Sequence, residues 1–106
     1  MARTPEGKVK DKVVAILKRE GVYYFFPATH GMGRSGVPDI ICCVAGRFLA
    51  IECKAGNGKT TLLQDRELNA IQAVGGIALV INEESLATVE NTVHKLKLKG
   101  LEHGHV

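Results

Sequence analysis

Hydrophobic residues recur along this chain with two periods, and the changes between them predict the order of helices and strands. The first segment begins with Thr4-Pro5-Glu6, which supplies a capping side chain, an early proline and an acid for a helix N-terminus. Gly21 is expected to end this helix. Its apolar residues, at helical spacing, are Val9, Val13, Ile16 and Leu17.

The next part of the chain has the composition of β-strands. Residues 22–26 are rich in β-forming side chains and end at Pro27, and residues 28–36 form a loop with three glycines. The apolar runs 38–46 and 47–54 then predict a buried β-hairpin that turns at Ala45-Gly46.

The second half predicts two more helices around one strand. Thr61-x-x-Gln64 matches a helix capping box, and this helix should run to about Val74. A short buried strand over 76–81 follows, and the last helix carries Leu86, Val89, Val93 and Leu96 and ends at Gly100. The order α-β-β-β-α-β-α predicts an α/β fold with a mixed central sheet and helices on its faces.

Length and composition narrow the possible classes of protein. A chain of 106 residues is one domain, 1–106, and no apolar run approaches the roughly 20 residues of a membrane helix. The N-terminus lacks a secretory signal, so we expect a cytoplasmic protein without a membrane partner. The net charge of +3 permits nucleic acid as a partner without requiring it.

The three cysteines do not have the spacing of a zinc site or of a disulfide framework. Cys42 and Cys43 are adjacent and Cys53 lies in another apolar run, so all three are expected to be reduced core residues.

Three charged residues stand at the ends of otherwise apolar strands: Asp39, Glu52 and Lys54. If the hairpin turns between Ala45 and Gly46, opposed residue numbers sum to a constant, and Asp39 then faces Glu52. Lys54 shares that face because it lies two residues further along the strand. One end of the hairpin would therefore carry two carboxylates and an ammonium group, unless an odd-length turn shifts the register by one residue.

Two opposed carboxylates repel each other, and a divalent cation between them would turn that repulsion into binding. Mg²⁺ and Mn²⁺ prefer such oxygen ligands, often one or two carboxylates together with waters. On these residues alone, a simple ion pair with Lys54 at the strand end is an equally good interpretation.

A wider set of residues resembles a known nuclease family. Pro38-Asp39 followed by Glu52-Cys53-Lys54 resembles the PD-(D/E)xK signature of metal-dependent nucleases. Together with Gly33-x-x-Gly36-Val37 before it and Thr61-x-x-Gln64 after it, the set resembles the VRR-NUC (virus-type replication-repair nuclease) branch of that superfamily. The resemblance spans Glu6 to about Gln64 and implies a restriction-endonuclease-like α-β-β-β-α-β core, followed here by a C-terminal helix.

The resemblance also implies an activity. Stand-alone members are expected to be homodimers that cut branched DNA such as four-way (Holliday) junctions, in a bacterial or phage-infected cell. Asp39, Glu52 and the backbone carbonyl of Cys53 would hold Mg²⁺ or Mn²⁺, with Glu6 as a further candidate ligand. For Glu6, an acid that complements the helix dipole is a better explanation than a direct metal ligand.

The resemblance further suggests roles for the polar residues around the carboxylates. Lys54 would orient the attacking water or offset charge in the transition state. Gln64 would be either a hydrogen-bonding catalytic residue or a helix cap. By their own chemistry, His30 and Arg34 on the glycine loop that leads into Asp39, and Lys59 after the motif, are candidate DNA contacts. For the loop, solvated charges on a mobile connector are the alternative.

Three other functions compete with a DNA nuclease. Gly58-Lys59-Thr60 suggests a P-loop, but the glycine required five residues earlier is Cys53, so nucleotide binding is disfavoured. A non-catalytic DNA-binding module on the same fold would not need the intact Asp39, Glu52 and Lys54. A ribonuclease on this scaffold is not excluded by the sequence.

Overall fold

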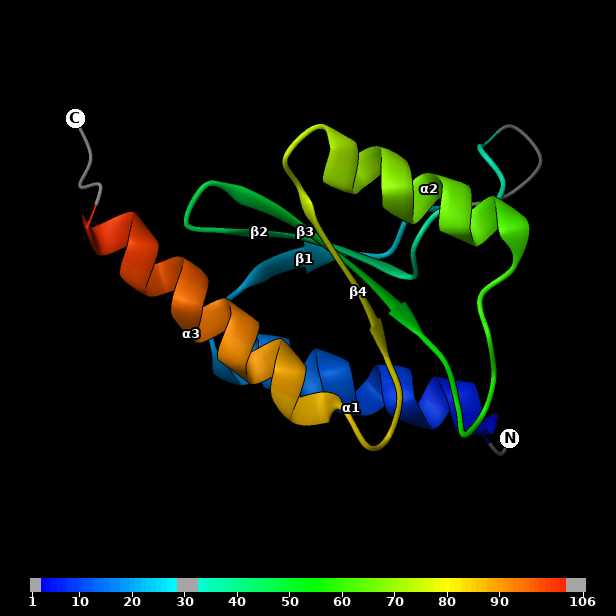
Figure 1. The fold of residues 1–106 in the computed structure, drawn as a ribbon. Coiled ribbons are helices and arrows are strands. Elements are labelled where there is room, and N and C mark those ends of the chain that lie inside the picture. Colours follow the sequence, from blue (N-terminus) through cyan, green and yellow to red (C-terminus); the bar gives the residue numbers. More distant parts are fainter. Residues whose placement is uncertain (1–2, 29–32, 103–106) are drawn as a thin grey trace.

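The computed structural model describes residues 3–28 and 33–102, and it has the predicted order of elements (Figure 1). The elements are α1 (Pro5–Arg19), β1 (Tyr23–Phe25), β2 (Ile40–Val44), β3 (Arg47–Cys53), α2 (Leu62–Ala73), β4 (Ile77–Ile81) and α3 (Leu86–Glu102).

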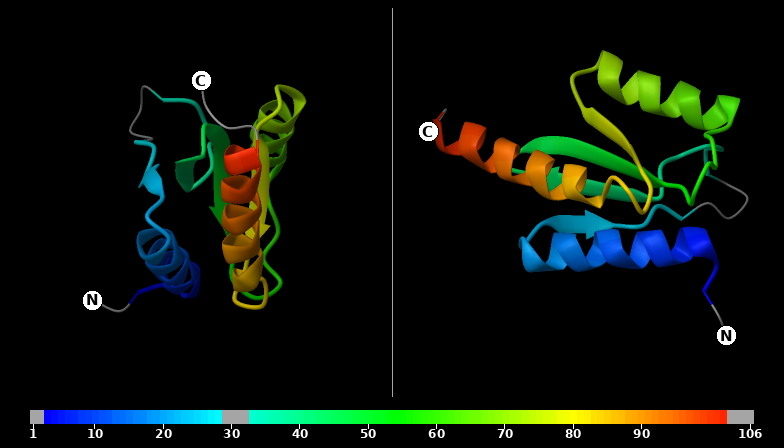
Figure 2. Two further views of the ribbon diagram at one scale, coloured as in Figure 1. Left: turned by 90° about the vertical axis from the view of Figure 1, so that its left-hand side faces the viewer. Right: turned by 60° about the horizontal axis from the view of Figure 1, so that its bottom comes forward.

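The four strands form one mixed sheet in the order β1-β2-β3-β4. β2 is antiparallel to β1 and to β3, whereas β4 is parallel to β3. Helices α1 and α3 cover one face of the sheet and α2 lies over the other (Figures 1 and 2). The α/β class and the mixed sheet with flanking helices are therefore confirmed.

The core lies between the sheet and the helix pair α1 and α3. Alternate residues of β3 point into it, and Leu49, Ile51 and Cys53 are completely buried there. The apolar stripes of the two helices meet them, with Val13 and Val93 also fully buried. This packing leaves the opposite set of β3 side chains, which includes Glu52, to face α2.

The turn of the β2–β3 hairpin fixes the register on which the site depends. Ala45 and Gly46 both have positive φ, 50° and 81°, as a two-residue type I′ turn requires. Val44 consequently pairs with Arg47, as predicted, and the ladder ends where Ile40 pairs with Ile51. The next opposed positions along the hairpin are Asp39 and Glu52.

Three sequence-based expectations were wrong in detail. Cys43 is exposed instead of forming part of the core, because its side of the sheet near β1 is not covered by α2. The strand β4 is only partly buried, since it lies at the sheet edge and Val80 is 48% exposed. Helix α3 continues through Gly100, where a Cβ atom would come within 2.7 Å of the Ala45 Cβ. Gly100 thus permits a close approach of helix and hairpin turn.

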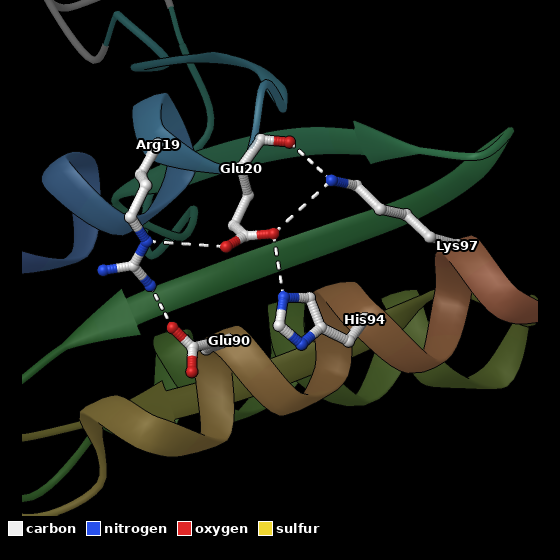
Figure 3. A network of polar contacts seen from close by, with 5 residues as sticks. All are labelled: Arg19, Glu20, Glu90, His94 and Lys97. Carbon is white, nitrogen blue, oxygen red and sulfur yellow. Dashed lines mark hydrogen bonds and ion pairs between the residues drawn. The ribbon is translucent and has the colours of Figure 1, made fainter.

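A polar network joins the C-terminal end of α1 to α3 (Figure 3). The Glu20 carboxylate lies 2.8 Å from His94 Nε2, and Lys97 donates a hydrogen bond of 2.6 Å to the Glu20 backbone carbonyl. The hydrogen bond with His94 lowers the pKa of Glu20. Arg19 binds Glu90 beside it. These contacts hold the two core helices together at the end of the molecule away from Asp39 and Glu52.

Among the described residues, no helix combines the length and the apolar character needed to cross a membrane.

Gly36 provides a test of how closely the glycine loop packs on α2. Gly36 and Gly21 both have positive φ, but only at Gly36 would a Cβ atom collide with backbone, at 2.6 Å from the Leu63 carbonyl carbon. Gly21→Ala should lower the free energy of unfolding by about 1–2 kcal/mol through backbone strain alone. Gly36→Ala should lower it by about 2–4 kcal/mol, because overpacking adds to the strain. Urea denaturation measures both, and equal losses would contradict the close contact.

Candidate active site

The candidate site lies at the end of the sheet where β2 begins and β3 ends (Figure 1). The N-terminal turns of α1 and α2 reach the same end, and the parallel ladder is extended there by a hydrogen bond from Lys54 N to the Ile81 carbonyl. Five predicted site residues meet in this region: Glu6, Asp39, Glu52, Lys54 and Gln64.

Glu52 is the centre of this group and is only 2% exposed. Its Oε2 accepts a hydrogen bond of 3.0 Å from Gln64 Nε2 and lies 3.4 Å from Lys54 Nζ. Its Oε1 is buried and has no hydrogen-bond partner among the described residues. An unsatisfied carboxylate oxygen in a buried site is costly, so this atom is a candidate ligand for a cation or a water molecule.

The surroundings of Glu52 disfavour its charged form. Burial, followed by repulsion from Asp39, raises the pKa of Glu52 to about 7, and the attraction of Lys54 offsets this only in part. The two carboxylates thus interact electrostatically, as the predicted cross-strand register requires. A bound cation would favour the ionised form that the protein alone disfavours.

Asp39 is fixed by the backbone of the neighbouring strand. Its Oδ2 accepts a hydrogen bond of 2.8 Å from Cys53 N. The Cys53 side chain points into the core on the other face, and burial raises the pKa of its thiol to about 12, which leaves it a poor nucleophile. The position of Cys53 is therefore compatible with a role for its backbone but not for its sulfur.

Lys54 connects two acids from different elements. Lys54 is 9% exposed, and its ammonium lies 3.4 Å from the Glu52 carboxylate and 4.0 Å from that of Glu6. Glu6 belongs to the first turn of α1, and its side chain is half exposed. Glu6 therefore places a second carboxylate close to the Lys54 ammonium.

Gln64 forms the helix cap that the sequence suggested, and it also makes a contact with Glu52 that the sequence did not suggest. Its Oε1 accepts a hydrogen bond of 2.9 Å from Thr61 N, and Thr61 Oγ1 accepts one from Gln64 N, which completes the capping box. Because the capping bond fixes the amide oxygen, the amide nitrogen is directed to Glu52. The helix cap therefore also positions the buried carboxylate.

The candidate DNA contacts that the structure describes differ in their surroundings. Arg34 pairs with Glu67 of α2 at 2.9 Å, although 75% of the arginine side chain is exposed. Lys59 is exposed on the loop before α2, and His30 lies outside the described residues.

The partner of Arg34 is the buried acid that the sequence analysis missed. Glu67 is only 7% exposed. It lies three residues after Gln64 and shares its helix face, which is the signal that could have revealed it.

The donor set fits a hard divalent cation. The described residues contain no group of three or more Asp, Glu, His or Cys side chains placed to hold a metal ion. Mg²⁺ and Mn²⁺ do not need one, because they are often held by one or two carboxylates and keep several waters. Asp39 and the unpaired oxygen of Glu52 supply that number of carboxylates.

Comparison with known proteins identifies a phage protein as a relative. No protein-family model matches the chain. A protein of Acyrthosiphon pisum secondary endosymbiont phage 1, described as "Putative nuclease p44", is 32% identical over 81 residues. The match covers 76% of this chain and 84% of the phage protein.

The chain belongs to the family of this phage protein. Since the alignment covers most of both sequences, the relationship concerns most of the domain and not one short motif. The VRR-NUC resemblance names a more specific family than this relationship does, and it stays a prediction.

The raised pKa of Glu52 predicts how stability depends on pH. Between its ordinary value of 4.5 and about 7, the folded protein retains a proton that the unfolded chain has lost. The free energy of unfolding should therefore fall as the pH rises through this window and level off above it. The loss from Glu52 should be on the order of 2–3 kcal/mol.

Glu52→Gln should remove this loss, whereas the exposed Glu84→Gln should retain it. Chemical denaturation in EDTA at about pH 4.5 and pH 8 measures the difference in each variant. Parallel pH profiles for the wild type and Glu52→Gln would contradict the assignment.

Proposed function

We propose that this protein is a Mg²⁺- or Mn²⁺-dependent DNA endonuclease of the PD-(D/E)xK type, similar to VRR-NUC proteins. One observation carries the proposal: a buried glutamate, Glu52, retains an oxygen without a partner in the described part of the chain, beside a second carboxylate and a lysine. A purely structural ion pair would be expected to satisfy both oxygens of a buried carboxylate. The description of the phage relative as a nuclease supports the same class of activity.

Different residues of the protein would have different roles in such a reaction. Asp39 and Glu52 would hold the cation, with the Cys53 carbonyl as an additional donor. When bound, a divalent cation supplies an activated water and offsets negative charge on the phosphate. Lys54, whose ammonium lies 3.4 Å from Glu52, would donate a hydrogen bond to the nucleophile or to a phosphate oxygen.

The other two residues would position this machinery. Gln64 would keep Glu52 in its rotamer through the bond from the α2 cap. Glu6 would restrain the Lys54 ammonium from the side of α1. The exposed Arg34 and Lys59 would contact the DNA backbone.

Branched DNA, such as a four-way junction, is the substrate we propose. Resolving such a junction requires two cuts, and this domain offers one candidate site. A homodimer would present two sites to the opposed strands. The similarity to stand-alone VRR-NUC proteins supports both parts of this proposal, and the phage relative supports a role in a bacterial or phage-infected cell.

The proposed activity is tested by cleavage of a four-way junction, a linear duplex and an RNA of matching sequence. Wild-type protein should cut the junction with Mg²⁺ or Mn²⁺ and not with EDTA. Asp39→Ala and Glu52→Gln should each lower the rate by about 100-fold or more while junction binding persists, because each removes a group needed in the transition state. Glu84→Gln is the control and should cut at the wild-type rate.

A wild-type cleavage rate in Asp39→Ala would contradict the site. Binding without cleavage by the wild type would instead support a non-catalytic DNA-binding module, and preferential cleavage of RNA would identify a ribonuclease.

Lys54 separates metal binding from turnover. Lys54→Ala should abolish cleavage because it removes the donor beside Glu52, yet it leaves both carboxylates in place. Its affinity for Mn²⁺, measured by calorimetry, should stay within about threefold of that of the wild type. Loss of Mn²⁺ binding together with cleavage would show that the lysine is needed to build the site and not for the chemistry.

A further inference from the structure

A groove with a volume of about 520 Å³ runs between α1 and β1, on the side of the sheet away from α2. The two elements lie side by side in the right-hand view of Figure 2. The groove is lined by Arg3, Lys10, Asp11, Val14, Ala15, Lys18, Tyr24 and Phe26. None of these residues was assigned a role in the proposed cleavage reaction.

The charge of this groove is positive. Arg3 is neutralised by Asp11, at 2.8 Å. Lys10 and Lys18 form no ion pair with any described residue, so both ammonium groups remain available to an anion. Eight residues separate them along α1, which corresponds to about 12 Å of helix.

Two aromatic rings form the opposite wall. Tyr24 and Phe26 lie with their ring centroids 5.9 Å apart, and Phe26 is 50% exposed. The Lys10 ammonium lies 4.1 Å from the centroid of the Phe26 ring. A cation and an exposed ring are thus held together by a cation–π contact at one point of the groove.

We propose that this groove binds single-stranded nucleic acid, with Lys10 and Lys18 on phosphates and a base against Phe26. Lysines supply the charge complementarity to a phosphate backbone. An aromatic ring can stack on a base only when the base is not enclosed in a duplex, and this favours a single strand over a double-stranded segment. An acidic peptide would use the lysines but would gain little from the ring.

One end of the groove lies towards the candidate active site. Glu6 contacts Lys54 and lies one helical turn before Lys10 on the same side of α1. Phe26 follows β1 at the end of the sheet where Asp39 and Glu52 lie. The inference rests on the proposed function in one respect, namely that the bound strand would be an unpaired arm of the DNA being cut.

The experiment uses fluorescence anisotropy of a labelled oligothymidine of about 12 nucleotides, with the full chain in EDTA so that cleavage cannot occur. Phe26→Leu should weaken binding about 10-fold, in keeping with the loss of one stacked base. Phe25→Leu is the matched control, because Phe25 is equally exposed, at 48%, but does not line the groove. It should bind like the wild type.

The salt dependence tests the lysines separately. The double variant Lys10→Gln, Lys18→Gln should reduce the slope of log affinity against log salt by about 1.4, since each phosphate contact to a single strand contributes about 0.7. Lys95→Gln, on exposed α3 surface, should leave affinity and slope unchanged.

Equal binding by Phe26→Leu and Phe25→Leu would overturn the stacking site. An unchanged salt slope in the lysine double variant would overturn the phosphate contacts, and tighter binding of a matched duplex by the wild type would overturn the preference for a single strand. These results are independent of cleavage. If the wild type does not cut any DNA but the groove variants lose affinity, the proposed nuclease activity is wrong and the proposed binding groove is supported. If the wild type cuts DNA but the groove variants keep wild-type affinity, only the proposed groove is wrong.

Discussion

The arrangement of this end of the molecule depends on the burial of one carboxylate. Glu52 lies on β3, one of the two inner strands of the sheet, where an apolar residue would pack at no electrostatic cost. The protein instead buries an acid beside Asp39, and among residues 3–28 and 33–102 the partners Lys54 and Gln64 satisfy only one of its oxygens. The electrostatic cost of burying this carboxylate is reflected in the raised pKa of Glu52. Such a cost is explained when the carboxylate has a ligand to bind.

The surrounding fold is organised to keep this acid in place. The Ala45-Gly46 turn sets the register that brings Asp39 opposite Glu52. The cap of α2 then directs Gln64 at the carboxylate. These constraints are local, so they were already visible in the sequence: the two-residue turn, the alternation along the strands and the capping box each predict one part of the geometry. This is why the order of elements and the convergence of the charged residues could be predicted without the structure.

The parts that could not be predicted depend on which surfaces meet in three dimensions. Cys43 looks like its buried neighbour Cys42 in the sequence, and only the limited extent of α2 leaves it exposed. Gly100 resembles a helix stop, but its missing side chain serves a contact with Ala45, over fifty residues away in the chain. Likewise, the contact between Lys10 and Phe26 in the groove results from the packing of β1 beside α1, and no periodicity within either segment encodes it.

The account as a whole requires that Asp39 and Glu52 jointly bind a divalent cation. Isothermal titration of the wild type with Mn²⁺ near pH 7, in buffers of different ionisation enthalpy, tests this directly. Binding should release a fraction of a proton per site from Glu52, because its pKa of about 7 leaves the carboxyl only partly protonated before the cation binds. Glu52→Gln should lose the proton release and at least about 10-fold in affinity. Wild-type affinity in Glu52→Gln, or no binding by the wild type at millimolar Mn²⁺, would contradict the account.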